Sequence, residues 1–108
     1  MPGAGELHRA FRSTDGGVKT VEAGAISGEL ELLTRPTPAG DAIEALVRYA
    51  GARNLYTVEG SPVRSVSDTP DESEHAAAHG RILEALTIRG PIRGGNEQPV
   101  DLRWDSEA

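Results

Sequence analysis

The 108-residue chain carries a formal net charge of −6 and contains no cysteine. The lack of cysteine excludes disulfides, a thiolate nucleophile and a cysteine zinc site. The negative charge disfavours a nucleic-acid partner, because such binding depends on neutralising phosphates. No stretch approaches the roughly 18 apolar residues of a membrane-spanning helix, and the first residues lack the apolar core of a signal peptide, so we expect a cytoplasmic protein.

The length is typical of a single domain, which at this size buries about 65% of the surface of its unfolded chain. Because the chain has only four aromatic residues, its core must consist mainly of Ala, Val, Ile and Leu. Lys19 is the only lysine, whereas arginine, alanine and glycine are frequent. This bias is typical of a GC-rich bacterial genome and indicates origin rather than function.

Residues 1–16 mix glycine, proline and charged residues, and only Leu7 and Phe11 are large and apolar. We therefore expect a flexible arm, or at most one short amphipathic turn. Residues 17–34 change to a β pattern, in which apolar and polar positions alternate after a turn at Gly24. This pattern predicts a hairpin with one face exposed to solvent.

Residues 37–51, TPAGDAIEALVRYAG, favour a first helix. Thr37 followed by Pro38 is a typical helix start, and Gly51 is suited to the left-handed residue after the last turn. The apolar residues have helical spacing, which predicts a buried stripe: Ala39, Ile43, Leu46, Val47 and Ala50.

Residues 55–58 and 61–66 predict a second hairpin, turned at Glu59-Gly60. Pro62 has no N–H to donate, so this hairpin should lie at a sheet edge. The opposite edge is then free to pair with a second copy, and we expect a homodimer.

A second helix is predicted from the capping box Thr69-Pro70-Asp71-Glu72 to about Leu86. After a glycine-rich loop, the alternation in 100–104, VDLRW, predicts a last strand with Trp104 on its buried face.

The expected fold class is therefore α+β: a single domain over 17–108, with the order ββ-α-ββ-α-β. About five strands would form an antiparallel sheet with two helices on one face. A duplicated ββα unit is an alternative interpretation, since both helices open on Thr-Pro.

His75 and His79 are four residues apart and project from the same face of the second helix. With Asp71 one turn earlier, they have the spacing of metal ligands. The same positions continue the apolar stripe of Ile82, Leu83 and Leu86, so the preferred interpretation is a structural or interface role. General acid–base chemistry is a third reading.

Two charged groups are candidate interaction sites. Carboxylates gather at the start of the second helix, where they favour the helix dipole and could dock a basic partner: Asp68, Asp71, Glu72 and Glu74. Arg89 and Arg93 flank a glycine-rich loop that could bind an anion, although such glycine pairs are also ordinary turn residues.

No nucleotide-binding or nucleophile motif is present, and we expect neither catalytic residues nor a cofactor. The sequence favours a non-catalytic binding or regulatory module that acts through a protein partner, with a basic partner suited to the acidic helix start. The alternative is a small-ligand or metal-binding protein, or an enzyme, centred on His75 and His79.

Overall fold

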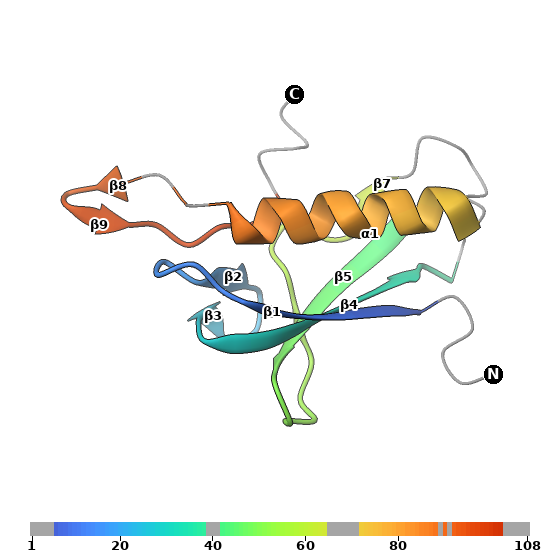
Figure 1. Ribbon diagram of the computed structural model, residues 1–108, viewed down its shortest axis with the longest axis horizontal. Coiled ribbons are helices and arrows are strands. Elements are labelled where there is room, and N and C mark those ends of the chain that lie inside the picture. Colours follow the sequence, from blue (N-terminus) through green and yellow to red (C-terminus); the bar gives the residue numbers. More distant parts are fainter. Residues whose placement is uncertain (1–5, 39–41, 65–71, 89, 91, 103–108) are drawn as a thin grey trace.

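The computed structural model describes residues 6–38, 42–64, 72–88, 90 and 92–102, which form one α+β domain (Figure 1). Its elements are short apart from two strands and the helix. In chain order they are β1 (Leu7–Arg12), β2 (Val18–Thr20), β3 (Gly24–Ile26), β4 (Glu29–Pro36), β5 (Ala42–Tyr49), β6 (Tyr56–Thr57), β7 (Val63–Arg64), α1 (Glu72–Thr87), β8 (Ile92–Arg93) and β9 (Asn96–Glu97).

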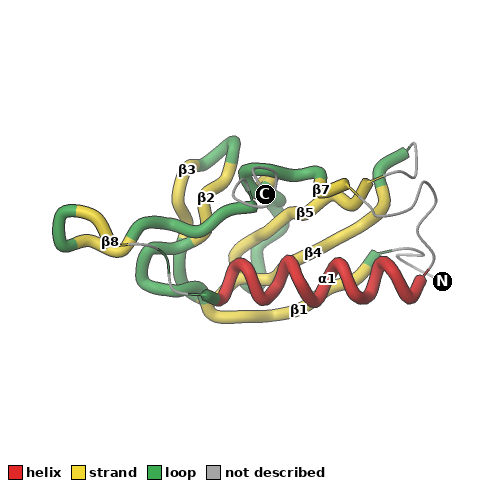
Figure 2. Tube along the Cα trace, turned by 90° about the horizontal axis from the view of Figure 1, so that it is seen from above, coloured by secondary structure: helices red, strands yellow, loops and turns green. Residues whose placement is uncertain are grey.

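The main sheet is antiparallel and has the order β1-β4-β5-β6, with β7 pairing β5 further along the same side. Helix α1 packs across one face of this sheet (Figure 1). Seen from above, α1 runs along the β1 and β4 side and leaves β5 and β7 beside it (Figure 2). The described residues therefore contain one helix rather than two, and the strands are divided between this sheet and two small ribbons.

The core lies between α1 and the sheet. In β4 and β5, alternate residues face the helix, because successive side chains of a strand point to opposite faces. Leu30, Leu32 and Val47 are completely buried there. On α1, Ile82 and Leu86 meet them, and both are buried as the stripe of the second helix predicted.

The first helix predicted from 37–51 is wrong, because residues 42–49 form β5. The apolar spacing arises from a strand that is buried on both faces. Ile43 and Val47 face α1, whereas Leu46 lies on the other face opposite Leu33 of β4. The paired β4 strand supplies a long-range partner that local propensity does not show. Gly51 does adopt a positive φ of 81°, but at a turn between strands.

The hairpin predicted from 55–66 is also wrong, since β6 and β7 do not pair with each other. Both pair antiparallel with β5, at Leu46–Val47 and at Ala42–Ile43 respectively. They are therefore two pieces of one interrupted strand, separated by an excursion at residues 58–62. The expected edge position of Pro62 agrees with the pairing of β7 with β5 alone.

The segment 1–16 was expected to be a flexible arm, but Leu7–Arg12 form β1 in full register with β4. The reason is the alternation of Leu7, Arg9 and Phe11, which places Phe11 against the core. Because Arg9 on this side is charged and the other side of the strand is exposed, the segment lacks the regular apolar alternation of a half-buried strand.

The predicted 17–34 hairpin is correct in part: β2 and β3 pair, but the turn between them lies at residues 21–23, with Gly24 in β3 opposite Thr20, and β4 joins the main sheet. Of the predicted last strand, Val100 makes a parallel bridge to Val18, and the Leu102 N–H donates to the Glu59 carbonyl at 2.9 Å. Trp104 lies outside the described residues. Gly16 and Gly90 allow this segment to pass closely, because a Cβ at either would lie 2.3 or 2.0 Å from the Gln98 carbonyl oxygen.

Candidate functional site

His75 and His79 converge on one hydroxyl group beneath α1. The Thr34 Oγ1 atom of β4 lies 3.1 Å from His75 Nε2 and 2.6 Å from His79 Nδ1. The Thr34 side chain is completely buried, and His75 is only 5% exposed. The three side chains form a polar bridge between helix and sheet inside an otherwise apolar layer.

The two hydrogen bonds assign proton positions. A hydroxyl has one proton, so Thr34 donates to one imidazole and accepts from the other. The shorter contact suits donation from Thr34 to His79 Nδ1, with His75 Nε2–H donating to Thr34. His79 is then neutral, because its Nδ1 atom accepts a hydrogen bond, whereas His75 can donate through Nε2–H in either protonation state. Burial lowers the pKa of His75, and burial together with the charges of His75, Arg9 and His8 lowers the pKa of His79.

This bridge does not have the form of a catalytic site. Thr34 next to His79 has the spacing of a nucleophile and its base, but no surface of Thr34 is open to a substrate. Among the described residues, no three His, Asp or Glu side chains gather as a metal site. Asp71, the third expected ligand, lies outside the part of the chain that the structure describes.

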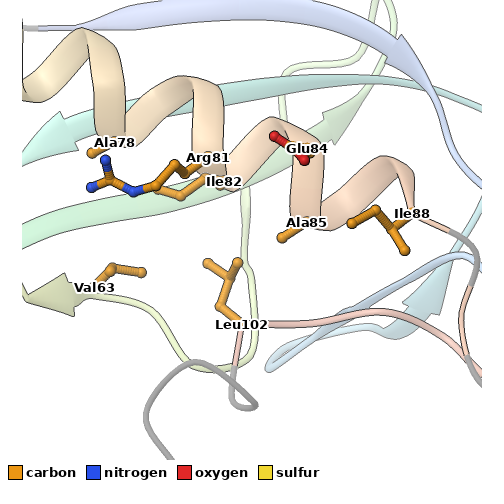
Figure 3. Close-up of a pocket in the computed structure, with 8 residues that line it drawn as sticks. All are labelled: Val63, Ala78, Arg81, Ile82, Glu84, Ala85, Ile88 and Leu102. Carbon is orange, nitrogen blue, oxygen red and sulfur yellow. The ribbon is translucent and has the colours of Figure 1, made fainter. Parts of the chain in front are cut away.

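A shallow apolar groove lies between α1 and β7 (Figure 3). It has a volume of about 220 Å³, below the roughly 300–1,000 Å³ of a typical small-molecule pocket. Arg81 and Glu84 border it, and Ile88 at its end is 53% exposed. The apolar lining consists of Val63, Ala78, Ile82, Ala85, Ile88 and Leu102.

The two edges of the main sheet differ. At the β6 edge, the Thr57 carbonyl accepts a hydrogen bond from Val21 N–H at 2.9 Å. The Glu22 carboxylate accepts two more, from Thr57 N at 2.7 Å and from Thr57 Oγ1 at 2.8 Å. These bonds lower the pKa of Glu22. The β6 edge is therefore occupied by the chain itself.

The β1 edge is long and regular, and its register identifies the backbone groups that point outward. Ser13 N–H donates to the Gly28 carbonyl, and Ala50 N–H donates to the Glu29 carbonyl. Since bonded and non-bonded pairs alternate in an antiparallel ladder, Leu7, Arg9 and Phe11 bond to β4. The N–H and C=O groups of His8, Ala10 and Arg12 therefore point away from the sheet, and β1 pairs with no other strand in the described structure.

The remaining predicted interaction residues are not brought together in the described structure. Glu72 and Glu74 belong to the first turn of α1, and Arg93 belongs to β8. Asp68 and Arg89, like Asp71, lie outside the described residues. The glycine-rich loop is a hairpin in which Gly94 and Gly95 have φ angles of 59° and 82°, as expected for ordinary turn residues.

Sequence reasoning identified the histidines but missed Thr34 and the β1 edge. Thr34 has no local signal, since its partners are 41 and 45 residues away. A signal for β1 was present in the alternation of Leu7, Arg9 and Phe11.

Comparison with protein-family models, curated proteins and solved structures finds no match to this chain. Within the described residues, no helix has the length and hydropathy needed to cross a lipid bilayer.

Proposed function

We propose that this protein is a non-catalytic binding module that acts through a protein partner, added as an extra strand at the β1 edge. The observation that supports this proposal is the outward direction of the backbone groups of His8, Ala10 and Arg12. Such unpaired groups are a template for an extended peptide, whose main chain supplies affinity and whose side chains supply specificity. We further propose that it acts in the cytoplasm of a bacterium, a proposal that its arginine-, alanine- and glycine-rich composition supports.

The test uses Ala10→Pro. Ala10 is exposed, and its N–H points away from β4, so proline removes a central donor of the edge without removing a bond inside the sheet. Ala10→Val is the matched control, because it changes the side chain and keeps the N–H. Partners would be captured from an extract of the source cells with the wild type and both variants.

We expect a partner that the wild type and Ala10→Val retain and Ala10→Pro loses. Ile88→Ser serves as a control for the groove, where Ile88 is exposed. A partner lost with Ile88→Ser and retained with Ala10→Pro would contradict the proposal and indicate that the partner binds in the groove. Sedimentation of the same variants tests the homodimer: a dimer lost with Ala10→Pro would make the partner a second copy.

The second candidate function is binding of a transition-metal ion by His75 and His79. The observation that favours it is the convergence of their ring nitrogens on Thr34 Oγ1. A metal would replace the hydroxyl as their shared partner, because neutral imidazole is a common metal ligand. Stoichiometric zinc or nickel retained by the purified wild type and lost in His75→Gln with His79→Gln would support it. Metal at background level in both would exclude it.

A further inference from the structure

We propose that the segment added at β1 has the pattern apolar-x-acidic-x-apolar, with its acidic residue opposite Arg9. This inference rests on the proposed function, because it names the kind of partner that the β1 edge accepts. It follows from the faces of β1, from the charges along it and from what a second copy would bring.

The pattern comes from the side of β1 that faces α1. Leu7, Arg9 and Phe11 share this side, and Phe11 packs against the core. Directly opposed residues of neighbouring strands have side chains on the same face. Residues opposite Leu7 and Phe11 would therefore extend the apolar layer, and the residue between them would meet Arg9.

Arg9 is the cation of β1 that has no ion pair in the described structure. Arg12 Nη1 lies 2.9 Å from Glu29 Oε1, and His8 lies within 3.8 Å of both Glu6 and Glu31. Arg9 is exposed, and His79 lies near enough for the Arg9 charge to lower its pKa. A carboxylate opposite Arg9 would supply the counter-charge that β4 supplies to Arg12.

The position of Arg9 in the ladder strengthens this preference. On the open side, His8, Ala10 and Arg12 would make the hydrogen bonds to an added strand, so Arg9 would lie in a non-bonded pair. Opposed Cα atoms are only about 4.5 Å apart in such a pair, compared with about 5.5 Å in a bonded pair. Arg9 would therefore interact electrostatically with the opposite residue at short range.

A second copy of the chain fits this edge poorly. Pairing two β1 strands antiparallel over residues 8–12 places His8 opposite Arg12 of the second copy, twice. Shifting the register by two residues in one direction places Arg9 opposite Arg9 of the second copy, and shifting it in the other direction pairs only residues 10–12 of each β1. Since β1 contains no carboxylate, the two longer registers oppose basic residues, which disfavours the pair.

The net charge of −6 does not prevent an acidic segment from binding here. Exposed charges are screened over about 8 Å at physiological ionic strength, so the groups that decide the preference are those next to the segment.

The experiment uses three synthetic nine-residue peptides with blocked ends, which remove the terminal charges. Their sequences are STVTETVTS, STVTQTVTS and STVTKTVTS, and they differ only in the residue meant to lie opposite Arg9. Titration of the isotope-labelled protein, followed by NMR, gives the affinity and locates the site. We expect the Glu peptide to bind about three- to tenfold more tightly than the Lys peptide, since opposed exposed charges differ by that order.

Arg9→Gln should remove the preference and leave all three peptides bound with similar affinity. On binding to the wild type, hydrogen exchange of the His8, Ala10 and Arg12 amides should slow, whereas the Leu7, Arg9 and Phe11 amides are already bonded to β4. This exchange pattern locates the added strand even if Ala10→Pro does not fold.

The outcomes separate the two proposals. Equal affinity for the Glu, Gln and Lys peptides, with slowed exchange at β1, would overturn the acidic preference and leave strand addition in place. A Glu preference that survives in Arg9→Gln would also overturn it. If no peptide slows exchange at β1, strand addition fails and the preference fails with it.

Discussion

The two faces of the main sheet use the same strands in different ways. On the face toward α1, Leu32 and Val47 are completely buried in a continuous apolar layer. On the outer face, Leu33 and Leu46 are buried as an isolated pair, and cross-strand ion pairs surround them. Those ion pairs join Arg12 to Glu29, Arg48 to Glu31 and Arg35 to Glu44.

The burial of a residue therefore does not by itself determine how much that residue contributes to the free energy of unfolding. Large substitutions on the α1 face leave a cavity between rigid elements, whereas the outer face is covered by long, flexible side chains that can close over a gap. The Thr34–His75–His79 bridge is a polar group within the apolar layer on the α1 face.

The largest expected effect is that of Leu32→Ala. Leu32 lies at the centre of β4, is completely buried and faces α1. We expect the free energy of unfolding to fall by about 3–5 kcal/mol, the sum of the transfer and cavity terms for a buried leucine. Urea unfolding measures it. A loss below about 1 kcal/mol would mean that α1 does not pack on the sheet as described.

Thr34→Val should have the next largest effect. Valine keeps the shape of threonine but removes the hydroxyl, so the buried His75 and the half-buried His79 lose their shared partner. We expect a loss of about 2–3 kcal/mol, because a buried polar group left unpaired costs roughly 1–3 kcal/mol. Thr34→Ser is the matched control, since it keeps the hydroxyl and loses only a methyl group. Equal stability of Thr34→Val and the wild type would show that the hydroxyl does not tie α1 to β4.

Leu46→Ala tests the outer face against Leu32→Ala. Leu46 is 9% exposed and lies opposite Leu33, outside the main core cluster. We expect a loss of about 1–2 kcal/mol, smaller than that of Leu32→Ala, because the apolar transfer term remains and the cavity term is reduced. Losses of equal size for both variants would break the distinction between the two faces.

Leu46 also shows why the sequence was misread at this strand. In a strand with apolar residues on both faces, these residues follow one another in the sequence. Ile43, Leu46 and Val47 therefore have the same spacing as residues on one face of a helix. The residues that decide between helix and strand lie in β4. Glu44 and Arg48 form ion pairs with Arg35 and Glu31 across the sheet. These cross-strand pairs cannot be inferred from the spacing of residues within 37–51.

Features fixed by local chemistry were predictable. The predicted second helix is present as α1, which ends at Thr87, one residue after the predicted Leu86, whereas most of its predicted capping box lies outside the described residues. The positive φ angles of Gly94 and Gly95 follow from their turn. The burial of His75 followed from its place in the stripe of α1. The hydroxyl that both histidines share could not be predicted, because it depends on which strand lies beneath the helix.

A smaller effect is expected from pH, through the histidines of the α1 face. Their pKa values are lowered in the folded protein, so between the folded values and the unfolded value of about 6.5 the unfolded chain binds more protons. Stability is therefore full above about pH 6.5 and falls as the pH decreases through this window. The charges of Arg9, on the α1 side of β1, and of His8, on its other side, lower the pKa of His79 further.

Urea unfolding between pH 8 and 5 measures this effect. His75→Gln with His79→Gln should flatten the curve, and His8→Gln, which removes only the smallest of the charges that lower the pKa of His79, should change it less. An unchanged slope in the double variant would show that the histidines do not carry the pH dependence.

The smallest effect is expected from the ion pair between Arg48 and Glu31 on the outer face. Arg48 Nε donates to Glu31 Oε1 at 2.6 Å, and the two side chains are 31% and 25% exposed. A double-mutant cycle with Arg48→Gln and Glu31→Gln isolates their coupling. We expect about 0.2–1 kcal/mol at low salt, because water screens the pair and both long side chains lose freedom. The coupling should shrink as salt is added.

The size of this coupling shows whether the stems or the charges of the ion-paired side chains protect Leu33 and Leu46 from water. With a small coupling, the ion-paired side chains act mainly as an apolar cover through their stems, and glutamine at both positions should leave most of the stability in place. A coupling above about 2 kcal/mol, beyond the usual range for exposed pairs, would instead make charge the main source of stability on the outer face. Leu46→Ala in the double-glutamine background then separates the two cases: a cost unchanged from about 1–2 kcal/mol means that the stems, and not the charges, cover the leucine pair.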